Sequence, residues 1–261
     1  MKVYYEEYGD KDAPLMVYLH GGGVSSWMWE KQVQHFTNYH CVVIDLPEQG
    51  RSSDEKTFSI ESSAASIIEL IEKLGNGKSI ILIGFSLGAQ VALQILCMKY
   101  DLIDYTIVNS ALVRPMPFTK KFIRPTITLT YPFIKIRAFS KLQAKTLYIN
   151  QEYFETYYQE SSQMTSDTLI RILEENMSFR IPNTFKKAKG KILVTVGAKE
   201  KAVMRKSASD IVASHANCTG IIIPKVGHGI SMAKPQYFNR MIENWLEDGS
   251  TPKDVEMIKS N

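Results

Sequence analysis

The strongest candidate for chemistry in this sequence is Ser86, which stands at the centre of the pentapeptide GFSLG, residues 84–88. An apolar run at 79–83 precedes the pentapeptide, and a helical pattern over 87–99 follows it. A tight turn from strand into helix leaves no room for side chains beside the serine, which accounts for the two glycines. Such a turn exposes the hydroxyl over the first helical turn, where free N–H groups and the helix dipole favour negative charge. This context predicts a nucleophilic serine.

A serine nucleophile needs a base, and the chain offers His20, His35, His40, His215 and His228. His228 stands between Gly227 and Gly229, after a strand pattern and downstream of the serine. In such a loop an unhindered imidazole can turn toward the serine, whereas surface or packing roles suit His35, His40 and His215. We therefore expect His228 to be the base. It must be neutral to accept a proton, so kcat/KM should rise with pH.

The glycine-rich stretch HGGG, residues 20–23, follows the apolar run Leu15–Leu19. One interpretation is a flexible turn. The other is a loop without side chains, from which a backbone N–H can approach a reacting carbonyl oxygen. Preorganised N–H donors of this kind contribute about 3–4 kcal/mol each to acyl transfer. We expect Gly22 N–H and Leu87 N–H, the latter just after the serine, to form such an oxyanion hole.

Short apolar runs alternate with helical patterns along most of the chain, which is typical of a mostly parallel sheet covered by helices. The strand patterns fall at 15–19, 41–44, 79–83, 103–108, 191–196 and 220–223, and the helical patterns at 26–37, 60–74, 87–99, 202–215 and 237–246. The alternation breaks at about 114–185, where prolines and aromatics gather without a strand pattern. We expect one domain over 1–248, with a cap inserted at about 114–185, and a loose polar tail at 249–261.

Composition excludes several other classes of protein. A net charge of +4 on 261 residues is too small to indicate a nucleic-acid-binding protein. The chain has no P-loop, no GxGxxG and no cluster of metal ligands, so neither a cofactor nor a metal is expected. No apolar run is long enough for a membrane span, and the N-terminus does not resemble a signal peptide. Three widely spaced cysteines favour reduced thiols. We expect a cytoplasmic protein of undetermined oligomeric state.

Four motifs together resemble the α/β-hydrolase superfamily: HGGG after a strand, DLPEQGRS at 45–52, GFSLG, and a late GHG. The resemblance covers about 3–246 and is to small esterase- and lactonase-like members with a helical cap. It implies a mostly parallel sheet of about eight strands, a cap after the sixth strand, and a triad in the order Ser, acid, His. In the family His20 and Asp45 are structural. Gln49 departs from the pattern, since the family usually has a histidine there.

The triad acid is less clear from the sequence. The resemblance implies a carboxylate three residues after a glycine that follows the next-to-last strand, and Glu200 fits this position after Gly197. It is one methylene longer than the usual Asp, and a glutamate at a helix N-terminus is also favoured by the dipole alone. The family's other acid position, after the sixth strand, holds no carboxylate here: it reads Val-Asn-Ser at 108–110. Asp210 is the next candidate, although it lies well inside a helical pattern.

Large apolar residues fall in segments that we expect to face the site: Trp27, Trp29, Phe85, Met116, Phe133, Met177 and Ile230. Residues of these types are more often part of the core, but together they indicate an apolar pocket. We therefore expect hydrolysis of a small carboxylic ester or related acyl compound through an acyl-enzyme. The alternatives are cofactor-free haloperoxidase or C–C hydrolase chemistry on the same triad, or a sensor of the same fold that binds a small ligand with slow or single turnover.

A run of basic residues marks the expected cap. It comprises Arg114, Lys120, Lys121, Arg124, Lys135, Arg137, Lys141 and Lys145, and no Asp or Glu follows Arg114 until Glu152. One interpretation is a solvated basic face. The other is a surface that attracts anionic substrates or rests on an acidic partner.

Overall fold

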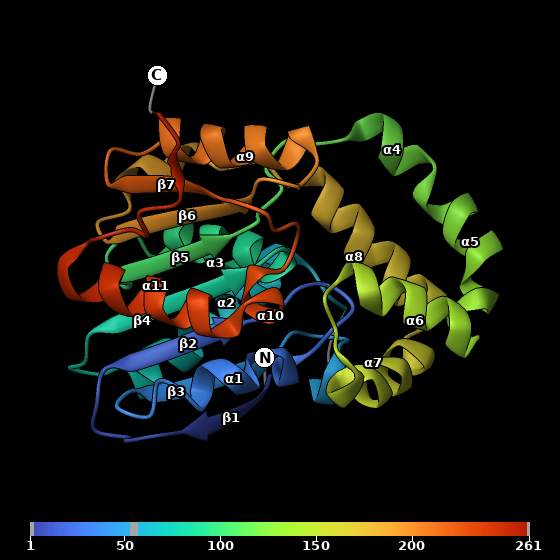
Figure 1. The fold of residues 1–261 in the computed structure, drawn as a ribbon, viewed down its shortest axis with the longest axis horizontal. Coiled ribbons are helices and arrows are strands. Elements are labelled where there is room, and N and C mark those ends of the chain that lie inside the picture. Colours follow the sequence, from blue (N-terminus) through green and yellow to red (C-terminus); the bar gives the residue numbers. More distant parts are fainter. Residues whose placement is uncertain (1–2, 53–56, 260–261) are drawn as a thin grey trace.

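The computed structural model describes residues 3–52 and 57–259, which fold around an eight-stranded sheet (Figure 1). The strand order is β1-β3-β2-β4-β5-β6-β7-β8. The strands are β1 Tyr4–Tyr8, β2 Leu15–Leu19, β3 His40–Asp45, β4 Ile80–Phe85, β5 Tyr105–Asn109, β6 Lys191–Gly197, β7 Cys218–Ile223 and β8 Glu256–Met257. Strands β2 to β7 run parallel, and the edge strands β1 and β8 run antiparallel to their neighbours. The predicted α/β-hydrolase sheet, mostly parallel with eight strands, is confirmed.

The central strands are apolar on both faces because helices cover both sides of the sheet. In β2, Leu15 and Val17 belong to the core on one face, and Met16 and Tyr18 to the core on the other. A parallel sheet buried on both faces needs such continuous apolar runs. The first face is covered by α2 Ile60–Leu74, α3 Leu87–Met98 and α9 Ala202–Ala213, and the second by η1 Ser26–Trp29, α1 Glu30–Val33, α10 Ile230–Ala233 and α11 Pro235–Asp248.

Five helices between β5 and β6 form a cap beside the core (Figure 1). They are α4 Pro117–Lys121, α5 Ile123–Ile134, α6 Arg137–Thr146, α7 Gln151–Gln163 and α8 Ser166–Ser178. A short helix, η3 Asn183–Lys187, then leads back to the sheet and contacts α3. In the described part of the chain, no helix is long and apolar enough to cross a membrane.

The structure corrects three expectations about the fold. The cap follows the fifth strand of the described chain, not the sixth, because the eighth strand is supplied by the C-terminal segment. That segment is not a loose tail: β8 pairs with β7, and Ile258 N–H donates to Gly220 O at 2.8 Å. The helix expected at 26–37 is only the short pair η1 and α1. The sequence analysis also missed strand β1, whose residues alternate poorly between apolar and polar.

Candidate active site

Ser86 stands at the turn between β4 and α3, with φ 52° and ψ −110°. This left-handed conformation is strained for a residue that carries a Cβ, and such strain is typical of a nucleophile elbow. The flanking glycines are required by close contacts: a Cβ on Gly84 would lie 2.5 Å from Gly88 O, and one on Gly88 would lie 2.3 Å from Leu19 O. The turn therefore presents the Ser86 hydroxyl at the carboxyl edge of the sheet.

Two backbone donors lie beside this turn. Leu87 is the first residue of α3, so its N–H has no partner within the helix. The glycine loop after β2 passes next to it: a Cβ on Gly22 would lie 3.6 Å from Leu87 Cδ2, and one on Gly21 would lie 3.5 Å from Ser86 Cβ. Over residues 3–52 and 57–259, no protein acceptor contacts Gly22 N–H or Leu87 N–H. Both donors are thus available to a ligand.

The glycine loop is held by two buried side chains. His20 Nδ1 lies 2.7 Å from Gly21 O and donates to it, while His20 Nε2 accepts Leu46 N–H at 2.8 Å. Burial lowers the pKa of His20 and outweighs the opposing effect of Asp45, so this imidazole is neutral. Gln49 Oε1 accepts Gly23 N–H at 3.0 Å. Both side chains therefore fix the backbone from which Gly22 N–H projects.

His228 and Glu200 form a hydrogen-bonded pair above the turn. His228 Nδ1 lies 2.8 Å from Glu200 Oε2, and the imidazole packs on Phe85 with 4.8 Å between ring centroids. The Glu200 side chain is 1% exposed and that of His228 is 32% exposed. Burial would raise the pKa of Glu200, but hydrogen bonds and the interaction with His228 bring it below its usual value. An ionised Glu200 keeps the proton on His228 Nδ1 and leaves Nε2 free to accept another.

Ser110 is a member of this network that the sequence analysis did not select. Its Oγ donates to Glu200 Oε1 at 2.7 Å, and Gly197 N–H donates to the same oxygen at 2.8 Å. Ser110 is buried and has a φ of 58°, so its hydroxyl is fixed by a constrained backbone. The sequence did offer one indication of this role: Ser110 directly follows β5, at the position where some members of the family carry the acid. There a hydroxyl contacts the carboxylate that comes from the neighbouring strand β6.

Comparison with known proteins decides the family. The model of the "Alpha/beta hydrolase family" matches residues 16–241. The chain belongs to this family. The resemblance expected from the motifs is confirmed.

Individual relatives of this hydrolase are distant. A putative 2-succinyl-6-hydroxy-2,4-cyclohexadiene-1-carboxylate synthase from Haemophilus influenzae is 28% identical over 78 residues, 30% of this chain and 32% of the relative. The chain thus spans about a third of the length of several curated relatives that it matches. A putative esterase/lipase from the same organism is 21% identical and covers 90% of this chain and 84% of its own. A solved bromoperoxidase from Bacillus anthracis superposes with a TM-score of 0.80 at 17% identity, covering 94% and 95% of the two chains.

The other candidate bases and acids of the hydrolase are engaged elsewhere. His35 contacts Glu243, His40 contacts Glu7, and His215 contacts Ala188 O. Asp45 is fully buried and accepts the N–H groups of Ser26 and Arg51. Asp210, the fallback acid, pairs with Arg114 at 2.7 Å. Among the candidate acids in the described part of the chain, only Glu200 contacts His228.

The expected pocket residues are dispersed. Phe85 packs on the His228 ring, and Ile230, two residues after His228, is buried at the start of α10. Trp29 is not a pocket residue: it is fully buried in the core, between Tyr18 and Phe238. Its indole has no surface to offer a substrate.

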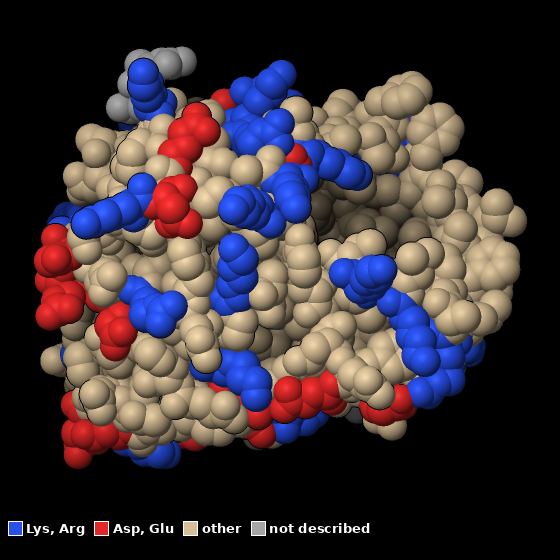
Figure 2. Space-filling view, viewed as in Figure 1, with Lys and Arg blue, Asp and Glu red and all other residues tan. Residues whose placement is uncertain are grey.

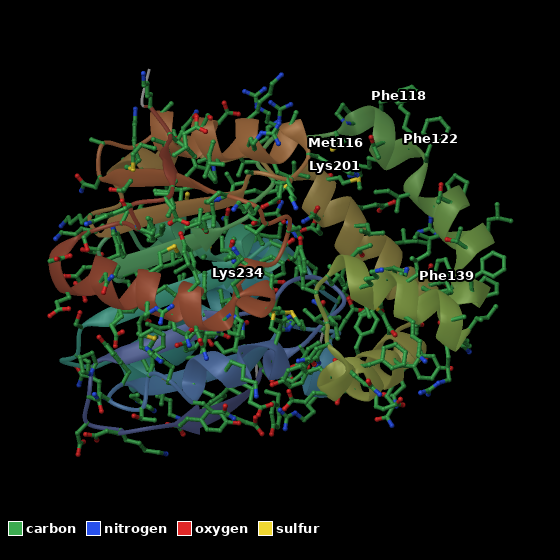
Figure 3. All side chains as sticks on the ribbon, viewed as in Figure 1. Met116, Phe118, Phe122, Phe139, Lys201 and Lys234 are labelled. Atoms are coloured by element: carbon green, nitrogen blue, oxygen red, sulfur yellow. The ribbon has the colours of Figure 1, made fainter. Side chains whose placement is uncertain are left out.

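The remaining predicted pocket residues lie in the cap or where the cap joins the core. Trp27 Nε1 donates to Glu160 of α7 at 2.9 Å, so this indole links the core to the cap. Met116 N–H donates to Met177 O at 2.9 Å where the cap joins the core (Figure 3). Phe133 is 46% exposed and contacts Phe139, so it lies on the outside of the cap and not in the pocket.

The cavity that reaches Gly22 is lined by the cap instead. It has a volume of about 150 Å³. Its lining comprises Gly22, Gly23, Tyr131, Ile134, Gln143, Leu147, Tyr157, Ser161, Met164 and Leu169. The sequence analysis selected the outward face of α5, with Phe133, whereas Tyr131 and Ile134 on the same helix face the cavity. Figure 2 shows that the surface is hollowed between cap and core.

Proposed function

We propose that this chain is a serine hydrolase that cleaves a carboxylic ester or related acyl bond of a small, largely apolar substrate through an acyl-enzyme. The observation that carries the proposal is the 2.8 Å pair of His228 and Glu200, with the imidazole packed on the residue before Ser86. A carboxylate, an imidazole and a strained serine in this order are the parts that acyl transfer requires. A putative esterase/lipase among the relatives supports the same class of reaction.

The reaction begins when His228 Nε2 accepts the Ser86 proton as Oγ attacks the substrate carbonyl. Glu200 stabilises the imidazolium by accepting Nδ1–H. The N–H groups of Gly22 and Leu87 receive the oxyanion, and His228 then returns the proton to the leaving alcohol. A water molecule, activated by the same imidazole, attacks the acyl-enzyme and releases the acid.

The small cavity beside Gly22 supports a limit on the size of the substrate group that is placed there. Its volume of about 150 Å³ lies below the range of roughly 300–1,000 Å³ that holds drug-sized ligands. Most of its lining is apolar, including Ile134, Leu147 and Leu169. We infer a preference for short acyl or alcohol groups.

The proposal is tested with p-nitrophenyl esters of increasing acyl length. We expect multiple turnovers with the acetate and butyrate, and a steep loss of kcat/KM at the octanoate. In Ser86→Ala, turnover should fall by at least about 10³-fold, because residual catalysis then depends on binding and the oxyanion hole alone.

A single burst of one product per chain would instead indicate a sensor that retains its acyl group. Unchanged turnover in folded Ser86→Ala would contradict the proposal.

A further inference from the structure

The outer side of the cap carries a continuous row of exposed apolar residues. We call this row the outer ridge; it consists of Phe118, Phe122, Pro125, Leu129, Pro132, Phe133 and Ile136. Phe118 and Leu129 are each 75% exposed, and Phe122 is 53% exposed. Within α5, the spacings of four and three residues place Pro125, Leu129 and Pro132 on one face of the helix. Phe118 lies on α4, Phe122 lies where α4 and α5 meet, and Ile136 lies just after α5. Figure 3 shows Phe118 and Phe122 at the outer edge of the cap, away from the sheet.

The fold itself does not use the ridge. The opposite side of α5 packs inward: Ile123 and Ile134 are buried, and Tyr131 donates its hydroxyl to Met164 O of the cap at 2.8 Å. Large apolar side chains exposed in a group, in contrast to single ones, mark an interaction surface. The chain therefore presents Phe118 and Leu129 to something outside itself.

The charged residues in the chain segment that carries the ridge are all positive, although Arg124 among them pairs with Asp167 of the neighbouring helix α8 at 3.4 Å. Residues 105–151 contain eight Lys and Arg and no Asp or Glu. Lys121 and Lys135 lie next to the ridge in the sequence, are exposed, and form no ion pair with any carboxylate of the described residues. Figure 2 shows the outer part of the cap, over α4 and α5, almost entirely as uncharged surface in this view, with no red. The unpaired charges beside the ridge, those of Lys121 and Lys135, are therefore positive, and a surface that is apolar and anionic would complement them.

Two threonine hydroxyls of α5 are satisfied within the helix. Thr128 Oγ1 donates to Arg124 O at 2.9 Å, and Thr130 Oγ1 donates to Thr126 O at 2.8 Å. A hydroxyl that already donates to its own helix loses less when water is removed from it. The exposed side of α5 is thus suited to contact with an apolar phase.

We propose that the outer ridge docks on an anionic lipid surface, with its aromatic and aliphatic side chains at the acyl boundary and its lysines at the headgroups. Apolar residues flanked by Lys and Arg on one helical face are the pattern of interfacial helices. Anionic headgroups neutralise the lysines, and the acyl boundary accepts Phe118 and Leu129. A second copy of the chain would place two positive faces together, which the charge disfavours. The proposal goes beyond the proposed function and does not depend on the triad.

The test is sedimentation of the full chain with vesicles of phosphatidylcholine alone or mixed with phosphatidylglycerol. We expect binding to the mixed vesicles, little binding to phosphatidylcholine, and release by added salt. Two variants, Phe118→Ser/Leu129→Ser and Lys121→Glu/Lys135→Glu, should each lower the partition coefficient at least about tenfold. Thermal unfolding verifies that each variant is folded.

The matched controls change exposed residues of the same kinds on the core. Met98→Ser/Tyr100→Ser and Lys186→Glu/Lys187→Glu should bind the mixed vesicles as the wild type does. Equal binding to both vesicle types, equal binding by all variants, or no binding at all would overturn the proposal. A wild-type dimer that Phe118→Ser/Leu129→Ser converts to a monomer would also overturn it, by assigning the ridge to a second copy.

Discussion

At the scale of single residues, Glu200 illustrates how a longer acid fits a site expected to hold Asp. Both carboxylate oxygens are used: Oε2 accepts from His228, and Oε1 accepts from Gly197 N–H and Ser110 Oγ. Because Oε1 is fixed at two points, the extra methylene does not leave the carboxylate free to rotate away from the imidazole. We infer that Ser110 is a positioning residue for Glu200.

Ser110→Ala tests this role. The change removes one hydrogen bond to a charged group, so kcat/KM should fall about tenfold. The hydroxyl also helps to lower the pKa of Glu200, so its loss should raise that pKa and make the carboxylate a stronger acceptor for the Nδ1 proton of His228. Since the acid limb of the pH–rate profile reports protonation of His228, it should shift to higher pH. The measurement is kcat/KM for p-nitrophenyl acetate as a function of pH.

The matched control is Ser66→Ala, which removes a buried hydroxyl from α2 that donates to Ser62 O. Ser66→Ala should leave the dependence of kcat/KM on pH unchanged. If Ser110→Ala lowers only stability, with the wild-type pH profile retained, the positioning role is wrong.

At the scale of elements, two partly buried glutamates join the cap to the core. Glu48, in the loop after β3, accepts from Arg171 of α8 at 2.9 Å through both carboxylate oxygens. Glu160 of α7 accepts from Ser25 Oγ at 2.7 Å and from Trp27 Nε1 at 2.9 Å. Burial raises the pKa of Glu160, whereas for Glu48 the hydrogen bonds from Arg171 outweigh burial and lower the pKa. Glu48 is therefore the link that acid should weaken.

We predict that Glu48→Gln lowers the free energy of unfolding by about 1–2 kcal/mol near neutral pH, a modest value because Arg171 is 35% exposed and partly screened by water. The folded-state pKa of Glu48 is lowered, so its contribution is present above the unfolded-state pKa and is lost as pH falls through the folded-state pKa. The difference in the free energy of unfolding between the wild type and Glu48→Gln should therefore be smaller at acid pH than near neutral pH. Urea unfolding at neutral and acid pH measures it.

Glu152→Gln is the comparison variant, because Glu152 meets Lys31 at 3.4 Å on the exposed surface. It should change stability little at either pH. An equal loss for Glu48→Gln at both pH values would show that its carboxylate charge does not hold the cap.

The core elements were predictable from sequence because their patterns are local. The strand Leu15–Leu19 and the helix Ile60–Leu74 agree with the structure residue for residue. The cap was not predictable in the same detail. Phe133 and Tyr131 lie two residues apart on α5, and which of them faces the cavity depends on the packing of α8 and α6 against that helix. Strand β8 depends on a long-range pairing with β7 that the polar sequence of residues 249–261 does not reveal.

At the scale of the whole molecule, the parallel sheet assembles the site from distant segments. Ser86 follows β4, Glu200 follows β6, and His228 follows β7, so all three leave the same edge of the sheet. Parallel strands present their carboxyl ends together, so the three residues come to one edge although they are far apart in the sequence. Ser86 and His228 were expected from their motifs, whereas Glu200 was expected only from the resemblance to the family. Contacts such as that between Ser110 and Glu200 depend on which strands are neighbours, which the motifs did not specify.

The central claim, that Ser86, His228 and Glu200 act as one unit, is tested most directly by the rate and site of labelling with a fluorophosphonate probe. Peptide mapping by mass spectrometry should find the label on Ser86 in the wild type and no label in Ser86→Ala. In Glu200→Gln the same serine should label more slowly, by about 10²–10⁴-fold, since the imidazole loses the partner that fixes its tautomer. Labelling of folded Ser86→Ala at the wild-type rate, or an unchanged rate in Glu200→Gln, would contradict the account.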